Sequence, residues 1–109
     1  MLTERGFFVV RASGSGVDGV SPDLIALHTT KKFALECKAR KDSLHFEKIK
    51  IEVMRGWEQT TGLPIYVAWK LPYKQWRFFP LSFLKETEKG YSLSKLEEET
   101  GMTLEELLK

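Results

Sequence analysis

Three ionisable residues stand at the ends of two apolar stretches that lie close together in the sequence. Asp23 follows Pro22 at the start of the first stretch, and Glu36 and Lys38 lie near the end of the second, which gives the pattern P-D-(x)12-E-x-K. Two adjacent carboxylates repel one another unless a cation lies between them, and an all-oxygen site with open water positions suits Mg²⁺ or Mn²⁺. We therefore predict a metal site formed by Asp23 and Glu36. Lys38 would orient a water or neutralise charge on a phosphate.

Two neighbouring strands would bring these side chains together. Residues two apart on a strand point to the same face, so Glu36 and Lys38 project together. Residues 24–27 and 33–38 are the predicted strands of a hairpin, and in that hairpin Asp23 arrives beside Glu36. The alternative is a solvated hairpin with ordinary outward-facing charges, because strands commonly alternate in this way. The complete pattern favours the metal site.

Length and composition indicate one folded domain. The chain has 109 residues, of which 42% are hydrophobic and 12% aromatic. No apolar run approaches the length of a membrane span, and residues 1–10 lack the pattern of a secretory leader. A single cysteine, Cys37, fits a reducing compartment. We expect one cytoplasmic domain over residues 1–109, with a core over 1–84 and a short helical, acidic tail over 85–109.

Charge differs between the core and the tail. Residues 1–84 hold 13 Lys and Arg against 8 Asp and Glu, whereas residues 85–109 hold 4 against 7. The basic core is compatible with a phosphate-rich partner such as nucleic acid, although the excess alone is weak support. The acidic tail is expected to lie away from the basic face or to help hold a dimer.

Hydrophobic periodicity and chain breakers predict the other elements of the core. A first strand is expected over 6–13, and the glycine- and serine-rich stretch over 13–21 is either a linker or a loop that folds over a nucleic-acid backbone. A helix over 42–62 leads to a strand over 63–71, which a right-handed crossover would make parallel to its neighbour. A final strand is expected over 76–80.

The predicted helix carries apolar residues on two sides. One stripe at helical spacing is expected to pack on the sheet, and it consists of Phe46, Ile49, Val53 and Trp57. Ile51 and Met54 fall off this stripe and indicate either a dimer surface or a mixed core edge.

The tail carries its own helix signals. A short helix is expected over 82–88, and a helical turn over 94–99 that ends at Gly101. Thr103 and Glu106 have the spacing of a capping box for a last short helix.

Basic residues lie at or near the ends of three predicted strands. Arg11 ends the first strand, Lys70 ends the fourth, and Lys74 and Arg77 lie around the last. Each is a candidate contact for a phosphate, and the alternative is a strand end that simply reaches solvent. The aromatic residues interleaved with Lys74 and Arg77 are more typical of a core or an interface than of base stacking.

Several short motifs occur together in an order that resembles a known family. They read R-A-S-G-S-G, S-P-D-L-I-A, A-L-E-C-K, V-A-W-K-L-P and W-R-F-F-P-L, and the resemblance that they carry covers about residues 6–84. Their order and spacing are similar to those of the archaeal-type Holliday-junction resolvases, within the PD-(D/E)-x-K nuclease superfamily. The resemblance implies an α/β, restriction-endonuclease-like fold with a mixed five-stranded β-sheet flanked by helices. It also implies a homodimer that cuts four-way DNA junctions. The expected metal ion is Mg²⁺, with Mn²⁺ as an alternative, and no small-molecule cofactor is needed.

The resemblance assigns roles to residues by position. Asp23 and Glu36 would hold the metal, and Lys38 would assist the attacking water. The residues that would contact the DNA backbone are Arg11, Ser13, Ser15 and Lys70, with Lys74 and Arg77 as further candidates.

One departure from the family concerns the start of the chain. The family opens with an amphipathic helix that brings another glutamate to the active site, and only five residues precede Gly6. The N-terminal helix is therefore expected to be missing, and Glu4 lies too near the first strand to replace that glutamate. The alternatives are a related nuclease that acts on duplex or nicked DNA, a junction-binding module impaired in cleavage, and a protein-interaction domain without a DNA role.

Overall fold

A twisted five-stranded sheet forms the centre of the structure, a computed structural model that describes residues 2–11 and 22–109. The strand order is β1-β2-β3-β5-β6, and the strands are β1 (Phe8–Arg11), β2 (Leu24–Leu27), β3 (Lys32–Ala39), β5 (Ile65–Lys70) and β6 (Arg77–Pro80). Only the β3–β5 pair is parallel among these neighbours, so the sheet is mixed, as predicted.

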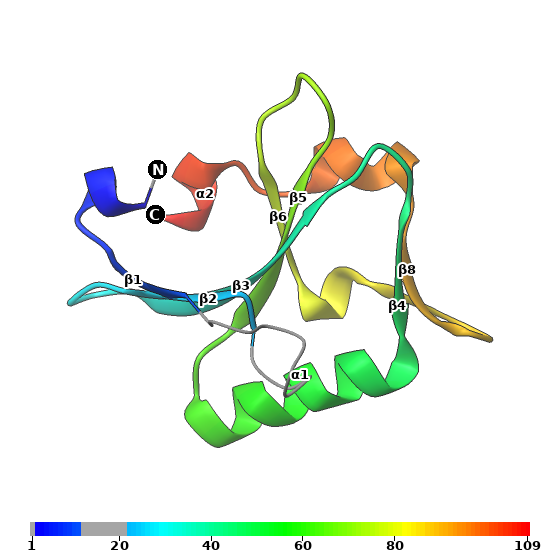
Figure 1. Ribbon diagram of the computed structural model, residues 1–109, viewed down its shortest axis with the longest axis horizontal. Coiled ribbons are helices and arrows are strands. Elements are labelled where there is room, and N and C mark those ends of the chain that lie inside the picture. Colours follow the sequence, from blue (N-terminus) through cyan, green and yellow to red (C-terminus); the bar gives the residue numbers. More distant parts are fainter. Residues whose placement is uncertain (1, 12–21) are drawn as a thin grey trace.

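A smaller antiparallel sheet and the helices surround this centre (Figure 1). The strands of the smaller sheet, in the order β4-β8-β7, are β4 (Leu44–Glu47), β8 (Gly90–Leu93) and β7 (Lys85–Thr87). The α-helices are α1 (Lys48–Thr61) and α2 (Leu104–Leu107), and the 3-10 helices are η1 (Thr3–Arg5), η2 (Leu81–Phe83) and η3 (Lys95–Thr100). No helix among residues 2–11 and 22–109 has the length and apolar character needed to cross a membrane.

Both faces of the five-stranded sheet are packed. On one face, Ile51 and Met54 of α1 join a buried cluster with Val67 and other sheet residues. On the opposite face, Leu107 of the tail packs in a cluster with Leu24 and Ala26 of β2 and Phe33 and Leu35 of β3. Alternation along β3 therefore sends Glu36 and Lys38, which share the face of Ala34, towards the side that α1 covers.

The start and the buried face of the predicted helix were wrong. Residues 44–47 form strand β4 because Leu44 and Phe46 alternate inward and the strand pairs with β8. The helix begins only at Lys48, although it ends before Gly62 as predicted. Ile49, expected to pack on the sheet, is 61% exposed.

The two residues assigned to a second stripe form the packed face of α1. Ile51 is fully buried and Met54 is 1% exposed, so neither is available as a dimer surface. Trp57 lies on the same side and packs against their cluster. The predicted stripe was misplaced because its first residue, Phe46, belongs to a strand and cannot fix a helical register.

The segment after β6 also departs from prediction. Residues 82–88 were expected to form a helix, but 81–83 form a 3-10 turn, and 85–87 pair with 90–93 as a hairpin of the smaller sheet. Strand β6 is therefore not the last strand. The backbone at Gly90 has a φ of +149° and a Cβ there would collide with the Phe46 carbonyl oxygen, so the absence of a side chain allows β8 to approach β4.

The two helical signals after residue 93 are confirmed. The turn over 95–100 ends before Gly101, and Thr103 and Glu106 form the predicted capping box. Met102 pairs with Phe78 as an antiparallel bridge, so the tail lies along the outer edge of β6. The end of the tail, residues 102–108, thus packs on the face opposite α1, whereas β8 of the same tail packs with α1.

Candidate functional site

Asp23 and Glu36 meet at the end of the β2–β3 hairpin. The predicted pairing is confirmed, because Leu24 lies opposite Leu35 and the next position on each strand places Asp23 opposite Glu36. The Asp23 amide donates to the Leu35 carbonyl at 3.0 Å, and the Cys37 amide donates to Asp23 Oδ2 at 2.7 Å. Backbone and side chain of Asp23 are therefore both held by β3.

Glu36 is a buried carboxylate with one open oxygen. The residue is 3% exposed, and its Oε1 has no hydrogen-bond partner among the residues that the structure describes. Burial raises the pKa of Glu36, the neighbouring Asp23 raises it further, and the nearby Lys50 and Lys38 ammonium groups act in the opposite direction. A buried polar atom without a partner is costly, so this oxygen indicates a position kept for a ligand.

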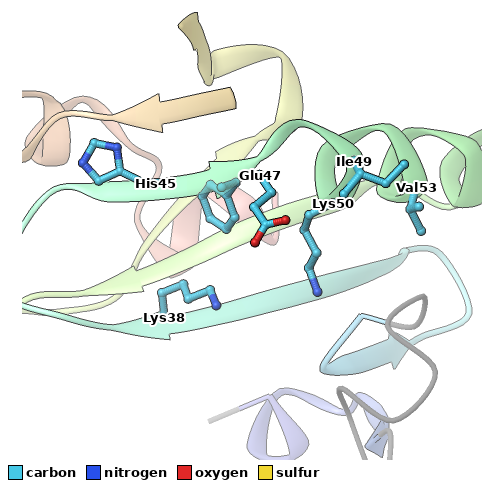
Figure 2. Close-up of a pocket in the computed structure, with 7 residues that line it drawn as sticks. Lys38, His45, Glu47, Ile49, Lys50 and Val53 are labelled. Carbon is cyan, nitrogen blue, oxygen red and sulfur yellow. The ribbon is translucent and has the colours of Figure 1, made fainter. Parts of the chain in front are cut away.

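Two lysines lie near the other carboxylate oxygen of Glu36, Oε2. Lys38 Nζ lies 4.0 Å from Oε2, and Lys50 Nζ lies 3.3 Å from the same atom. Figure 2 shows Lys50 extending from α1 towards β3, where Lys38 lies. Two cations therefore lie near Oε2, whereas Oε1 has no hydrogen-bond partner in the part of the chain that the structure describes.

Lys50 is a site residue that the sequence did not single out. It lies in the first turn of α1, and its side chain reaches a residue 14 positions earlier. The first turn of α1 contains no acidic residue, although acidic residues are favoured there by the helix dipole. Two lysines, Lys48 and Lys50, in this turn were the available signal, but the wrong helix start concealed it.

The donors present fit a divalent metal that keeps most of its water. Within residues 2–11 and 22–109, no group of three or more His, Cys, Asp or Glu side chains is placed to hold a metal ion. Mg²⁺ is commonly bound by one or two carboxylates, with waters and substrate phosphates as its other ligands. Asp23 and the open Oε1 of Glu36 supply such a pair of oxygens.

The other predicted basic residues lie around this centre rather than in it. Arg11 is opposite Leu24 in the sheet and therefore projects to the face of Leu24, away from Glu36. Lys70 is opposite Ala39, one position beyond Lys38, and lines a small cavity with Arg40 and Lys41.

Lys74 and Arg77 are engaged by the tail. Lys74 Nζ lies 3.4 Å from a carboxylate oxygen of Glu98 and 3.4 Å from one of Glu99. Arg77 donates to the Gly101 carbonyl at 3.1 Å. The structure does not bring either cation to the carboxylate pair.

Two further predicted DNA contacts, Ser13 and Ser15, lie outside the residues that the structure describes.

Comparisons with known proteins point to one family. The sequence model of the archaeal Holliday junction resolvase family (Hjc) matches residues 1–109. A crossover junction endodeoxyribonuclease Hjc from Archaeoglobus fulgidus is 34% identical over 108 residues, which cover 97% of this chain and 79% of that protein. The protein of the same name from Sulfurisphaera tokodaii is 36% identical over 114 residues, which cover 99% and 78% of the two chains.

Comparison of the fold with solved structures identifies the same family. The solved structure of Archaeoglobus fulgidus Hjc, described as a Holliday junction resolvase from an archaeal hyperthermophile, superposes with a TM-score of 0.86 at 31% identity. The match covers 97% of this chain and 84% of the other. From sequence and structure together, the chain belongs to the archaeal Holliday junction resolvase family.

Proposed function

We propose that this chain is a structure-selective endonuclease that resolves four-way DNA junctions by hydrolysing phosphodiester bonds. The observation that carries the proposal is the buried Glu36 carboxylate, which keeps one oxygen open beside Asp23 while two lysines hold the other. This combination offers oxygens to a metal and cations to a phosphate within one small site. Membership of the resolvase family supports the choice of a branched DNA substrate.

Asp23 and Glu36 are the residues that would hold Mg²⁺, with Mn²⁺ as an alternative ion. When bound, such an ion neutralises charge on the phosphate and favours deprotonation of a water. The hairpin contributes rigidity, because the Asp23 carboxylate is held by the Cys37 amide and cannot swing away from Glu36. Lys38 offsets the negative charge that grows on the phosphate.

The reaction itself is a simple hydrolysis. The water oxygen forms a bond to phosphorus while the bond from phosphorus to the leaving sugar oxygen breaks. The water loses a proton to solvent, and the leaving oxygen takes one up. The products are one phosphate end and one hydroxyl end, so neither an oxidant nor a small-molecule cofactor is needed.

Cutting both strands of a junction requires two sites, and a homodimer supplies them. Strand β1 is an edge strand, and its side chains Phe8 and Val10 are 71% and 43% exposed. Exposed apolar residues on a sheet edge favour an interface with a second copy. Sedimentation of Phe8→Glu tests this, with Leu96→Glu as the control because Leu96 is 94% exposed on the tail. A wild-type monomer at micromolar concentration would contradict the dimer.

The activity is tested with a synthetic four-way junction in the presence of Mg²⁺. We expect paired cuts by the wild type, and a loss on the order of 100-fold or more in Asp23→Asn and Glu36→Gln. Undiminished cutting by both variants would refute the site. Equal binding and cutting of linear or nicked duplex would favour a less selective nuclease, and tight junction binding without product at any Mg²⁺ or Mn²⁺ concentration would favour a binding module.

A further inference from the structure

Lys50 lies in the site but has no role in the reaction proposed above. Its Nζ is the nearer of the two ammonium groups to Glu36 Oε2, at 3.3 Å against 4.0 Å for Lys38. Its side chain is 33% exposed, whereas that of Glu36 is 5% exposed. The ammonium group therefore bridges a buried carboxylate and the solvent side of the site.

The position of Lys50 is fixed by the packing of α1. The next residue, Ile51, is fully buried, and Met54 anchors the following turn. These two side chains set the rotation of the helix, so Lys50 has little freedom to leave the site by rotation of α1. Lys38 reaches Glu36 from the same strand, whereas Lys50 reaches it from a separate element.

The stability of α1 does not explain a lysine at this position. The positive end of the helix dipole disfavours cations in the first turn, and the N-cap residue Glu47 makes no side-chain capping bond. A lysine at this position that pairs with a buried carboxylate is better explained by the site than by the helix.

A groove of about 400 Å³ opens beside the two lysines (Figure 2). Lys38 and Lys50 line it together with His45 and Glu47 of β4 and the half-exposed apolar side of α1 at Ile49. Glu47 lines the groove between the two lysines in the view of Figure 2, and Ile49 and Val53 of α1 lie beside Lys50. The two ammonium groups can take the phosphate of a nucleotide, and the apolar side chains of Ile49 and Val53 can take its sugar and base.

We infer that Lys50 is a second lysine of the reaction, which rests on the proposed nuclease function: while it is paired with Glu36 Oε2, its ammonium group contacts the DNA phosphate in the groove. Lys38 and Lys50 then flank the phosphate from two different elements. This role differs from that of a structural ion pair, because the Lys50 ammonium group contacts both the Glu36 carboxylate and the DNA phosphate.

The test compares Lys50→Met with Lys48→Met. Both remove one charge from the first turn of α1, but Lys48 is 62% exposed and pairs with Glu86 on the smaller sheet. For Lys50→Met we expect junction cleavage to fall on the order of 100-fold. The slope of log affinity against log salt, measured for junction binding in EDTA, should fall by about 1. Lys48→Met should leave both quantities within experimental error, and Lys50→Arg should recover part of the cleavage.

Mn²⁺ binding without DNA separates this role from simple damage to the fold. Removing a cation beside two carboxylates should tighten Mn²⁺ binding by Lys50→Met, observed by electron paramagnetic resonance, even though cleavage is lost. Slower cleavage together with weaker Mn²⁺ binding would mean a structural role and would overturn the inference. If the wild type cuts junctions and Lys50→Met cuts them equally well, the inference is also overturned. If the wild type does not cut junctions at all, the proposed function itself is refuted.

Discussion

The Asp23 carboxylate accepts a hydrogen bond from the Cys37 backbone amide at 2.7 Å, which places a negative charge directly beside the only cysteine of the chain. Burial raises the pKa of the Cys37 thiol to about 11, and the charges of Asp23 and then Glu36 contribute to the increase. The site therefore suppresses the thiolate form of the cysteine that adjoins it. Cys37 is a packing residue on the far side of β3, not a nucleophile.

We predict that Cys37 is alkylated slowly in the native protein. A pKa of about 11 in place of 9.0 lowers the thiolate fraction at pH 8 by about 100-fold. The rate of iodoacetamide labelling, followed by mass spectrometry, should fall by a similar factor relative to the same chain unfolded in urea. Asp23→Asn is the matched variant and should react faster than the wild type, because a neighbouring negative charge is removed. Equal rates in the folded and unfolded wild type would contradict the prediction.

Glu36→Gln should stabilise the metal-free protein near neutral pH. Because the pKa of Glu36 is raised in the folded state, the folded protein holds this proton more tightly than the unfolded chain does. The free energy of unfolding then falls as pH rises from below 4.5 through the raised pKa. Replacing the carboxylate by an amide should gain about 0.5–2 kcal/mol in urea unfolding at pH 7.5 with EDTA.

The gain from Glu36→Gln should disappear below the ordinary glutamate pKa, where the wild-type side chain is protonated in both states. Glu105→Gln is the control, since the pKa of the exposed Glu105 is lowered by its own backbone amide and by Arg5. Mg²⁺ should raise the melting temperature of the wild type and not that of Glu36→Gln. A Glu36→Gln protein that is less stable than the wild type at pH 7.5 in EDTA would contradict this prediction.

How far the sequence predicted this site depends on the separation of its residues. Asp23, Glu36 and Lys38 were found because a two-residue period and one tight hairpin determine their relation. Lys50 was missed because its position depends on where α1 begins. Residues 44–47 are a strand through pairing with β8, more than 40 residues later, and no local pattern contains that contact.

In the tail, too, the contacts between residues far apart in the sequence were not predicted. Its capping box and its turn over 95–100 are local and were predicted correctly, whereas the residues expected as a helix over 82–88 include strand β7, which pairs with β8. The burial of Leu107 against the far face of the sheet, and the pairing of Lys74 with Glu98, are tertiary contacts over long sequence separations. Composition identified an acidic tail, but only the fold shows that one of its carboxylates is buried.

Lys74→Met should destabilise the fold through that buried carboxylate. Glu98 is 2% exposed, and its Oε2 has no hydrogen-bond partner within the described structure. Loss of the Lys74 ammonium group leaves its charge unpaired, at a cost of about 1–2 kcal/mol in urea unfolding. Lys85→Met, which removes an exposed pair with Glu97, should cost less than about 0.5 kcal/mol.

The double variant Lys74→Met/Glu98→Gln should recover most of this stability. It also tests the predicted DNA contact of Lys74 without a folding defect. A junction affinity equal to that of the wild type would assign Lys74 to the tail alone, whereas weaker binding with a reduced salt slope would support a phosphate contact. If Lys74→Met were as stable as the wild type, the buried pair would have no structural role.

A single methyl group at Gly90 should impair both stability and catalysis. The positive φ of Gly90 disfavours any side chain, and a Cβ would collide with the Phe46 carbonyl oxygen and lie 3.2 Å from the Lys48 amide. Gly90→Ala should therefore cost more than about 2 kcal/mol. Gly56→Ala is the opposite case, because nothing lies within 4 Å of its Cβ in the exposed middle of α1. It should gain about 0.5–1 kcal/mol.

The catalytic effect follows from where Gly90 makes its contact. Phe46 and Lys48 mark the point at which β4 becomes α1, and the first turn of α1 carries Lys50 to Glu36. A displacement there moves the ammonium group away from the carboxylate before it disturbs the β2–β3 hairpin. Single-turnover cleavage by Gly90→Ala, measured at a temperature where the variant is still folded, should therefore fall towards that of Lys50→Met while Gly56→Ala cleaves normally. A folded Gly90→Ala protein with wild-type cleavage would show that the β4–α1 junction does not position the site.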